Sequence, residues 1–310
     1  MSRRKSRGRL VSGILLLNKP LEMSSNKALQ IVKHLFNAAK AGHTGSLDPL
    51  ATGMLPICLG EATKVSQYLL EADKVYQVSF KLGERTATGD AEGEIVETKS
   101  YDLVTEKQIN EVIPEFLGDL EQIPPMYSAL KHDGQRLYDL ARQGVEVERK
   151  SRHIHISEIE LLSFEQGVVE LKVACSKGTY IRTLAEDMAR ALNTVSYVTK
   201  LHRLEVGSFS DYPMVTLEEL RRAAEEGEQQ LDKKLLPLDI GIMTMPELKL
   251  NDDLSYYMCL GQPVQVPNAP AKGLVRLYND KRFLGIGEIN SVGLVAPKRL
   301  MSTQVKTSIE

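Results

Sequence analysis

The feature that most limits how this chain can fold is the segment at residues 42–53, which reads GHTGSLDPLATG. Three glycines, a proline and several hydroxyl side chains argue against a regular helix and against a central strand. We therefore predict a shaped loop. It holds one carboxylate, Asp48, close in sequence to one imidazole, His43.

Asp48 and His43 each have a structural and a functional interpretation. Pro49 pushes Asp48 toward extended geometry and removes the next backbone donor. An isolated Asp-Pro pair is most often a structural turn, in which the aspartate bonds its own backbone. A lone histidine is likewise more often solvated or internally paired than functional. The functional alternative is a carboxylate held ready for chemistry.

Periodicity outlines an α+β chain around this loop. Apolar runs or alternation predict strands at 14–17, 76–82 and 169–175. Helical spacing predicts helices that begin after the Ser24-Ser25 cap, at about 61–70 and at 181–192, and Thr216 with Glu219 forms a capping-box signal. Past Pro237, short apolar runs between prolines and glycines indicate a small β-rich module of about 60 residues, near the lower size limit of a domain. We place the boundary near 245, giving domains at 1–245 and 246–310, and expect fraying after about 302.

Charge is segregated along the 310 residues. The formal net charge is only -2, but it is +6 over residues 1–80, -6 over 81–210, -6 over 211–260 and +4 over 261–310. The total argues against a bulk-basic polymer binder and against a highly charged disordered chain. Three scattered cysteines, no signal-peptide pattern and no apolar stretch of membrane-spanning length predict a cytoplasmic protein without disulfides or a zinc site.

Two further segments carry candidate functional side chains. The sequence SKGTYIR at 176–182 lies at a predicted strand-to-helix junction, where Arg182 can face the open end of a sheet and hold a carboxylate. The simpler interpretation is an anion-binding helix start or a surface arginine. Tyr76 opens an alternating strand, so it is either a core aromatic or a platform on which a base stacks. No phosphate-binding loop, dinucleotide fingerprint or metal-ligand cluster is present, so an enzyme here would work with side chains alone.

These segments together resemble the TruB family of bacterial tRNA pseudouridine synthases. The likeness lies in 42–53, in Lys74-Val75-Tyr76, in 176–182 and in Asn18-Lys19-Pro20. Residues 83–93, 122–131 and 137–144 add to it, and 273–276 with 296–300 resemble the small RNA-binding PUA module. Several ordered motifs over nearly the whole chain make a chance match very improbable.

The resemblance implies a fold, a reaction and roles for single residues. The fold is a mixed, largely antiparallel sheet with flanking helices, followed by a compact β-barrel-like PUA module. The reaction is isomerisation of the T-loop uridine at tRNA position 55, on a base flipped out of the loop, with no cofactor or metal and no obligatory protein partner. The family precedent is a monomer. The resemblance implies three catalytic residues: Asp48 as the carboxylate, Arg182 as its partner, and Tyr76, which also stacks on the base and assists a proton transfer. The other implied site residues are His43 as filler of the vacated space, Tyr180 and Leu201 as pocket lining, and Lys19 and Pro20 as structural support.

Three points stay open at the level of sequence. Asp48 could attack the uracil ring, attack C1′, or act on a sugar proton, and the role of Asp90 is undefined. A non-catalytic RNA-binding module is one alternative, although it would be expected to lack Asp48. A base-removing hydrolase is another, although it would usually show paired carboxylates or a metal site.

Overall fold

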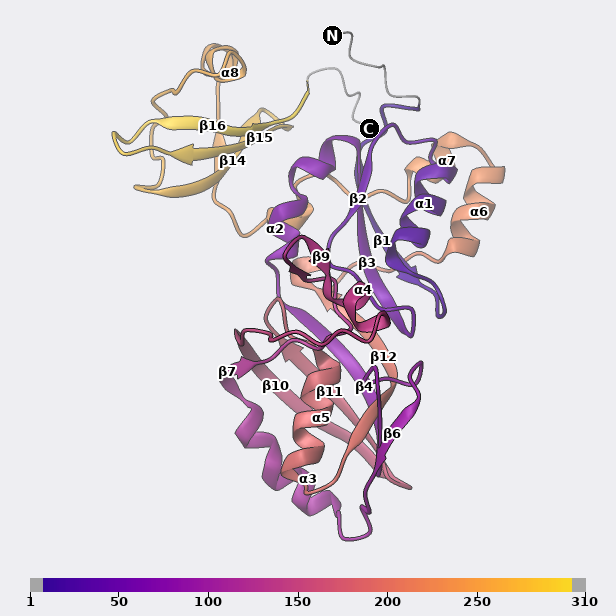
Figure 1. Cartoon of the computed structure of the whole chain (residues 1–310). Coiled ribbons are helices and arrows are strands. Elements are labelled where there is room, and N and C mark those ends of the chain that lie inside the picture. The colour runs from indigo at the N-terminus through magenta and orange to yellow at the C-terminus, as the bar shows by residue number, and fades with distance from the viewer. Residues whose placement is uncertain (1–7, 303–310) are drawn as a thin grey trace.

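The computed structural model describes residues 8–302, and Figure 1 shows a main domain with a smaller C-terminal module at one end. A single eight-stranded sheet runs through the main domain in the order β1-β3-β12-β4-β11-β10-β7, with β2 paired to β3. Its strands are β1 (Gly13–Lys19), β2 (Ala41–His43), β3 (Ala51–Leu59), β4 (Lys74–Leu82), β7 (Gly118–Gln122), β10 (Arg152–Glu165), β11 (Val168–Cys175) and β12 (Ser196–Val206).

The main sheet is mixed and largely antiparallel, as predicted. Strand β12 runs parallel to β3, and every other pairing in the sheet is antiparallel. The central strands are buried, and β4 and β11 show the alternation expected from their sequences. The fold class is therefore confirmed.

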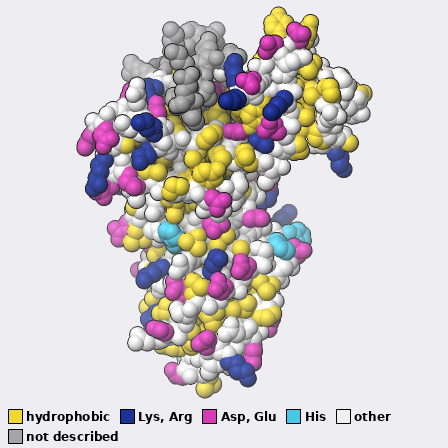
Figure 2. All heavy atoms as spheres, turned by 180° about the vertical axis from the view of Figure 1, so that it is seen from behind, with side chains coloured by type: hydrophobic (Ala, Val, Ile, Leu, Met, Phe, Trp, Pro, Cys, Tyr) yellow, Lys and Arg dark blue, Asp and Glu magenta, His cyan; other side chains and the backbone are white. Residues whose placement is uncertain are grey.

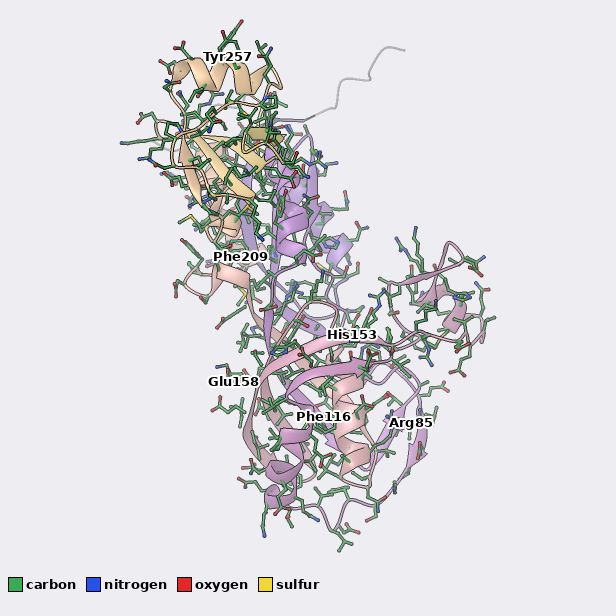
Figure 3. All side chains as sticks on the ribbon, turned by 90° about the vertical axis from the view of Figure 1, so that its left-hand side faces the viewer. Arg85, Phe116, His153, Glu158, Phe209 and Tyr257 are labelled. Carbon is green, nitrogen blue, oxygen red and sulfur yellow. The ribbon has the colours of Figure 1, made fainter. Side chains whose placement is uncertain are left out.

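Helices cover this sheet and complete the main core. Helix α5 (Ile181–Ala191) places Leu184 and Met188 against the sheet, while α1 (Ser25–Leu35) and α6 (Leu217–Glu225) lie beside β1 (Figure 1). The remaining elements are α2 (Ser66–Leu70), β5 (Glu84–Thr86), β6 (Ile95–Thr98), α3 (Glu106–Val112), β8 (Lys131–His132), β9 (Gln135–Arg136), α4 (Leu137–Arg142) and α7 (Glu228–Asp232), with 3-10 turns at Gly60–Lys64, Ile113–Phe116, Gly207–Phe209 and Ile240–Ile242. The part that contains β8, β9 and α4 projects from the body near His153 (Figure 3).

Two of the predicted helix starts are confirmed by their caps. Ser24 caps α1 by accepting a hydrogen bond from the Lys27 amide, and Thr216 and Glu219 form a reciprocal capping box on α6. These short-range signals hold because each depends on residues within one turn.

Two local predictions were wrong. The expected helix at 61–70 is a 3-10 turn followed by the short α2, since the hydroxyls of Thr63 and Ser66 bond nearby carbonyls. The segment 42–53 is not a loop throughout, because its ends belong to β2 and β3. Gly53 sits in the sheet interior at φ +97°, where a Cβ atom would lie 2.3 Å from the Arg203 carbonyl oxygen. The glycine permits that close approach.

The C-terminal module has its own four-stranded sheet, in the order β13-β14-β15-β16. Strands β13 and β14 pair in parallel, and no pairing between β13 and β16 closes the sheet within residues 8–302. The module is thus an open sheet rather than the barrel-like form that we expected. Its elements are β13 (Glu247–Lys249), α8 (Asp252–Cys259), β14 (Gly273–Asn279), β15 (Arg282–Ile289) and β16 (Val295–Leu300).

The module packs against the main domain through apolar side chains. Ile286 joins a buried cluster that contains Leu16 of β1 and Phe209, and Lys64 donates to the Leu300 carbonyl at 2.7 Å. The boundary near 245 stays a prediction, and the predicted frayed segment from 303 lies outside the described residues. Within residues 8–302, no helix has the length and apolar character needed to cross a bilayer.

Candidate active site

The loop that carries Asp48 is fixed by a side chain of α1. The Ser25 hydroxyl accepts from the Leu47 amide at 2.7 Å and donates to the Leu47 carbonyl at 3.0 Å. On the other side, the Ala51 amide donates to the Asp48 carbonyl at 3.0 Å, which closes a turn around Pro49. The backbone on both sides of Asp48 is therefore tied down, so its carboxylate points in a defined direction.

Lys19 supports the same loop from the end of β1. Its buried ammonium donates to the carbonyls of Pro20 (2.9 Å), Met23 (2.6 Å) and, more weakly, Pro49 (3.4 Å). Burial lowers the pKa of Lys19 to about 8, and the nearby Asp48 carboxylate opposes that fall. Lys19 thus joins the chain that follows β1 to the Asp48 turn.

Asp48 forms an ion pair with Arg182. The distance between Asp48 Oδ2 and Arg182 Nη2 is 3.0 Å, and the aspartate side chain is 44% exposed whereas that of the arginine is only 6% exposed. Within residues 8–302 no backbone N–H donates to the Asp48 carboxylate. The interpretation of Asp48 as a self-bonded structural turn is therefore wrong.

The Arg182 guanidinium is held in place by groups on two other segments. It donates to the carbonyls of Thr88 and Tyr127, each at 2.7 Å. It also lies 3.5 Å from Asp90 Oδ2, and Asp90 is itself buried. A buried arginine with several fixed partners presents its remaining N–H groups rigidly. Of the two carboxylates that face Arg182, that of Asp48 is the more exposed and that of Asp90 is buried.

Asp90, whose role the sequence left undefined, belongs to this network. Its Oδ1 accepts from the Thr88 hydroxyl at 2.5 Å and from the Glu92 amide at 3.1 Å, while Oδ2 faces Arg182. The backbone beside it pairs with β12, because the Ala91 amide donates to the Val198 carbonyl. Asp90 therefore anchors Arg182 at Nη1, whereas Asp48 faces Nη2.

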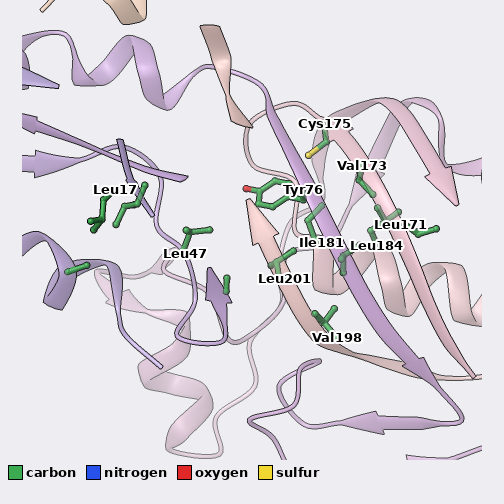
Figure 4. Packing of buried hydrophobic residues seen from close by; sticks show 14 of the residues in the cluster. Leu17, Leu47, Tyr76, Leu171, Val173, Cys175, Ile181, Leu184, Val198 and Leu201 are labelled. Atoms are coloured by element: carbon green, nitrogen blue, oxygen red, sulfur yellow. The ribbon is translucent and has the colours of Figure 1, made fainter. Parts of the chain in front are cut away.

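Tyr76 and Leu201 lie on neighbouring strands beside this ion pair. Figure 4 shows the Tyr76 hydroxyl pointing toward the loop that contains Leu47, with Leu201 next to the ring. Leu201 pairs with Val78 of β4 and with Ala51 of β3. Burial raises the pKa of the Tyr76 hydroxyl, whereas the nearby Arg203 guanidinium opposes that rise. Tyr76 is thus a neutral phenol at the inner wall of the site.

Tyr180 is held at the start of α5 by a buried amide. Gln122 accepts from the Tyr180 backbone amide at 2.8 Å and donates to its carbonyl at 3.1 Å. Burial raises the pKa of the Tyr180 hydroxyl. These two hydrogen bonds fix the backbone of Tyr180, which lies two positions before Arg182.

His43 lies at the end of β2, where the Asp48 loop begins. Its Nδ1 atom is buried and has no hydrogen-bond partner among the described residues. Burial, helped by the Arg203 charge, lowers the pKa of His43 below its ordinary value. His43 therefore carries a neutral ring at neutral pH.

The structure brings most of the predicted site residues together. Asp48, Arg182 and the Lys19-Pro20 turn meet directly. Tyr76 and Leu201 form one wall of the site. His43 lies beside the loop, and Tyr180 lies beside the helix start.

Sequence reasoning missed Arg203 altogether. The signal available was its place two residues after Leu201, which puts a charged residue on the inward face of a strand. Across residues 8–302, no three His, Cys, Asp or Glu side chains gather in a way that could hold a metal ion.

The lowered pKa of Lys19 yields a prediction for stability. Above pH 8 the folded protein loses a proton that the unfolded chain keeps until about pH 10.5, so the unfolded state binds more protons and stability rises with pH. We expect Lys19→Met to remove this slope, which is at most about 1.4 kcal/mol per pH unit for one proton. Denaturant unfolding of both proteins at pH 7.5, 8.5 and 9.5 measures it. Equal slopes would contradict the prediction.

Comparison with known proteins finds relatives that match nearly the whole chain. Residues 33–181 match the family described as TruB family pseudouridylate synthase (N terminal domain), 182–242 match a tRNA pseudouridylate synthase B C-terminal domain and 246–301 match a pseudouridine synthase II TruB C-terminal domain. The tRNA pseudouridine synthase B of Pseudomonas fluorescens is 52% identical over 96% of this chain and 97% of its own. That of Nitrosococcus oceani is 52% identical over 97% and 98%.

Solved structures of two complexes contain chains with the same fold. A Cbf5-Nop10-Gar1 complex matches with a TM-score of 0.69 and 27% identity, over 89% of this chain and 78% of that one. An H/ACA RNP bound to a substrate RNA containing 2'-deoxyuridine matches with a TM-score of 0.72 and 23% identity, over 98% and 92%, which shows the fold alone. The sequence relationships, which span nearly the whole chain, place it in the TruB family, and as a member it is a tRNA pseudouridine synthase, an isomerase that modifies RNA.

Proposed function

We propose that this protein isomerises the T-loop uridine at tRNA position 55 to pseudouridine, with Asp48 as the catalytic carboxylate. The observation that carries the proposal is the fixed ion pair between the exposed Asp48 and the buried Arg182. A charged partner keeps a carboxylate ionised and oriented while a substrate displaces water from it. Within residues 8–302 the Asp48 carboxylate has no hydrogen-bond donor other than Arg182, so it is available to the substrate.

The reaction requires little more than such a carboxylate. The bond between N1 of uracil and C1′ breaks, the base turns, and a bond forms between C5 and C1′ while C5 loses its proton and N1 gains one. Product and substrate have the same atoms, so no oxidant and no net water are consumed. Asp48 suits attack on the ring, attack on C1′ or removal of a sugar proton, and the three routes stay open.

The residues around Asp48 fit a base that has left its stack. Extruding a nucleotide from a folded loop costs a few kcal/mol, and stacking on an aromatic ring recovers about 1–3 kcal/mol. Tyr76 supplies that ring, and Leu201 and Tyr180 supply the neighbouring walls. The neutral ring of His43 can fill the space left in the RNA without the cost of burying a charge.

Four basic side chains of the described residues line one surface that suits RNA phosphates. A hollow of about 410 Å³ between the main domain and the module is lined on one side by Lys40 and Lys64 and on the other by Lys298 and Arg299. Figure 2 shows Lys and Arg side chains on the rear face near this join. Lys64 and Lys298 pair with glutamates, whereas Lys40 and Arg299 are exposed and have no ion pair within residues 8–302.

We expect Lys40→Ala and Arg299→Ala each to weaken tRNA binding and to lower the salt dependence of the affinity, by about 0.9 in the slope of log K against log salt for each phosphate contact. The rate at saturating enzyme should not change. Filter binding at several salt concentrations measures this effect. Lys107→Ala, on α3 of the main domain, removes the same charge elsewhere and is the control. An unchanged slope in both variants would rule out this surface.

We propose further that the chain acts as a monomer in the cytoplasm without an obligatory protein partner. The chain itself contains both the site and the basic surface. Its described cysteines are free, and Cys58 and Cys175 are buried, as in proteins of reducing compartments.

Digestion of an unmodified tRNA to nucleosides, before and after incubation with the purified protein, tests the function. Pseudouridine at the T-loop position supports the proposal. Release of free uracil would instead identify a hydrolase, and tight binding without conversion would identify an RNA-binding module. A T-loop uridine replaced by cytidine is the substrate control.

A further inference from the structure

We propose that Arg203 is a positioning residue, which clamps the Asp48 loop and aligns it with Tyr76 on the neighbouring strand. This inference rests on the proposed function, because it assigns Arg203 a part in holding the site for that reaction. Arg203 lies on β12, between the strand that leaves the Asp48 loop (β3) and the strand that carries Tyr76 (β4).

The backbone register places Arg203 opposite both strands at once. Its partner on β3 is Gly53, and its partner on β4 is Tyr76. Directly opposite residues of an antiparallel pair project to the same face, so Arg203 and Tyr76 share one face. A Cβ atom on Gly53 would lie 2.3 Å from the Arg203 carbonyl oxygen, so Gly53 has to be a glycine for the strands to meet here.

The Arg203 side chain then reaches both ends of the loop. Its Nε donates to the Met54 carbonyl at 2.7 Å, and its Nη2 donates to the Gly45 carbonyl at 3.1 Å. These two residues bracket the segment that contains Asp48. A planar guanidinium with donors in fixed directions is suited to join two acceptors in this way, whereas a lysine ammonium is not.

The charge of Arg203 is buried without a counter-ion. Arg203 is 1% exposed, and within residues 8–302 no carboxylate oxygen lies within ion-pair distance of it. Arg182 and Arg276, which are also buried, each face two carboxylates. Burying an unpaired charge is costly, and an apolar residue of similar length would fill the volume without that cost. What the guanidinium adds here is its pair of directed hydrogen bonds to the loop.

The unpaired charge also acts on the residue at the start of the loop. Arg203 is the charged group that contributes, after burial, to the lowered pKa of His43, and Ile57, which pairs with His43 on β3, is uncharged. The positive field disfavours protonation of the imidazole. Loss of the clamp and loss of the charge therefore have separable consequences.

Three variants separate these consequences. Arg203→Met removes both the clamp and the charge. Arg203→Lys keeps the charge but lacks the planar guanidinium that bonds both ends of the loop. Val206→Ala weakens the core on the same strand without touching the loop. All three are compared with the wild type at a temperature at which circular dichroism shows them folded. The reaction is followed as single turnover on unmodified tRNA with saturating enzyme, and tRNA affinity is measured separately.

We expect Arg203→Met to lower the single-turnover rate by about 100-fold, the scale set by small displacements of catalytic groups, with unchanged tRNA affinity. Arg203→Lys should lose part of the rate, and Val206→Ala none. A titration followed by NMR on protein with 13C-labelled histidines should show the pKa of His43 raised in Arg203→Met and unchanged in Arg203→Lys. The exposed His153 serves as internal reference.

Equal rates in Arg203→Met and Val206→Ala would overturn the proposal, and so would a fall in affinity that accounts for the whole loss. Hydrogen exchange of the backbone amides at 45–54 measures how firmly Arg203 holds the loop, and it needs no RNA. Faster exchange there in Arg203→Met, but not in Val206→Ala, is expected, and equal exchange would overturn the clamp. If the wild type forms no pseudouridine, the proposed function fails, whereas exchange and titration still decide whether Arg203 holds the loop.

Discussion

Replacement of Asp48 by asparagine is expected to lower pseudouridine formation by about 10⁴-fold, the scale seen when one member of a catalytic group is removed, while tRNA binding is retained. Asparagine has nearly the same shape, and the loop is held by Ser25 and Lys19 rather than by the carboxylate itself. Arg182 keeps its bonds to two backbone carbonyls and to Asp90. The variant therefore loses the nucleophilic or basic oxygen with little change in geometry.

Single-turnover assays with nucleoside analysis measure the rate, and filter binding measures the affinity. Ser46→Ala, an exposed position two residues earlier in the same loop, is the matched control and should convert tRNA normally. Normal conversion by Asp48→Asn would remove Asp48 from the chemistry. Loss of binding in parallel with activity would mean that Asp48 positions the RNA instead of reacting with it.

The sequence was a good guide wherever the relevant forces act over a few residues. The cap at Ser24, the capping box at Thr216 and the alternation of β4 and β11 depend on near neighbours and hold in the structure. Strands β10 and β12 were not predicted. One face of β10 is largely exposed, and β12 alternates buried with charged or partly exposed side chains, so neither shows an apolar run. Their identity depends on the sheet around them.

The same distinction between local and long-range interactions applies to the site residues. Asp48 was visible because a rigid loop isolates it, and Arg182 because its junction motif is distinctive. Asp90 and Arg203 were not resolved, since each acts through partners about 90 to 160 positions away in sequence, such as Arg182 for Asp90 and Gly45 for Arg203. A single sequence contains no measure of such long-range contacts. Only the register between β3, β12 and β4 makes the part played by Arg203 visible.

The fold brings together basic residues that are far apart in the sequence. A net charge of -2 gives no hint of an RNA partner, but Lys40 and Lys64 meet Lys298 and Arg299 at the join between the domain and the module. A local patch of this kind suffices for phosphate contact. We propose that the low net charge restricts binding to RNA that reaches both this patch and Asp48.

The second large effect is expected at Arg182. Arg182→Met leaves Asp90 as a buried carboxylate without its cation, which should cost about 3–5 kcal/mol of stability, and it removes the partner of Asp48, which should abolish activity. Adding Asp90→Asn to Arg182→Met takes away the stranded charge. We therefore expect the double variant to regain most of the lost stability and none of the lost activity.

Denaturant unfolding of the wild type, the two single variants and the double variant forms a cycle that yields the coupling between the two residues, expected at about 3 kcal/mol because most of the loss in Arg182→Met is regained. Single-turnover rates on the same four proteins separate stability from chemistry. Asp90→Asn alone keeps the Asp48–Arg182 pair and should lose only part of the rate. Additive stabilities would mean that Asp90 does not anchor Arg182. Activity regained in the double variant would show that Asp48 needs no cation, because then the inactivity of Arg182→Met would come from the stranded charge of Asp90 alone.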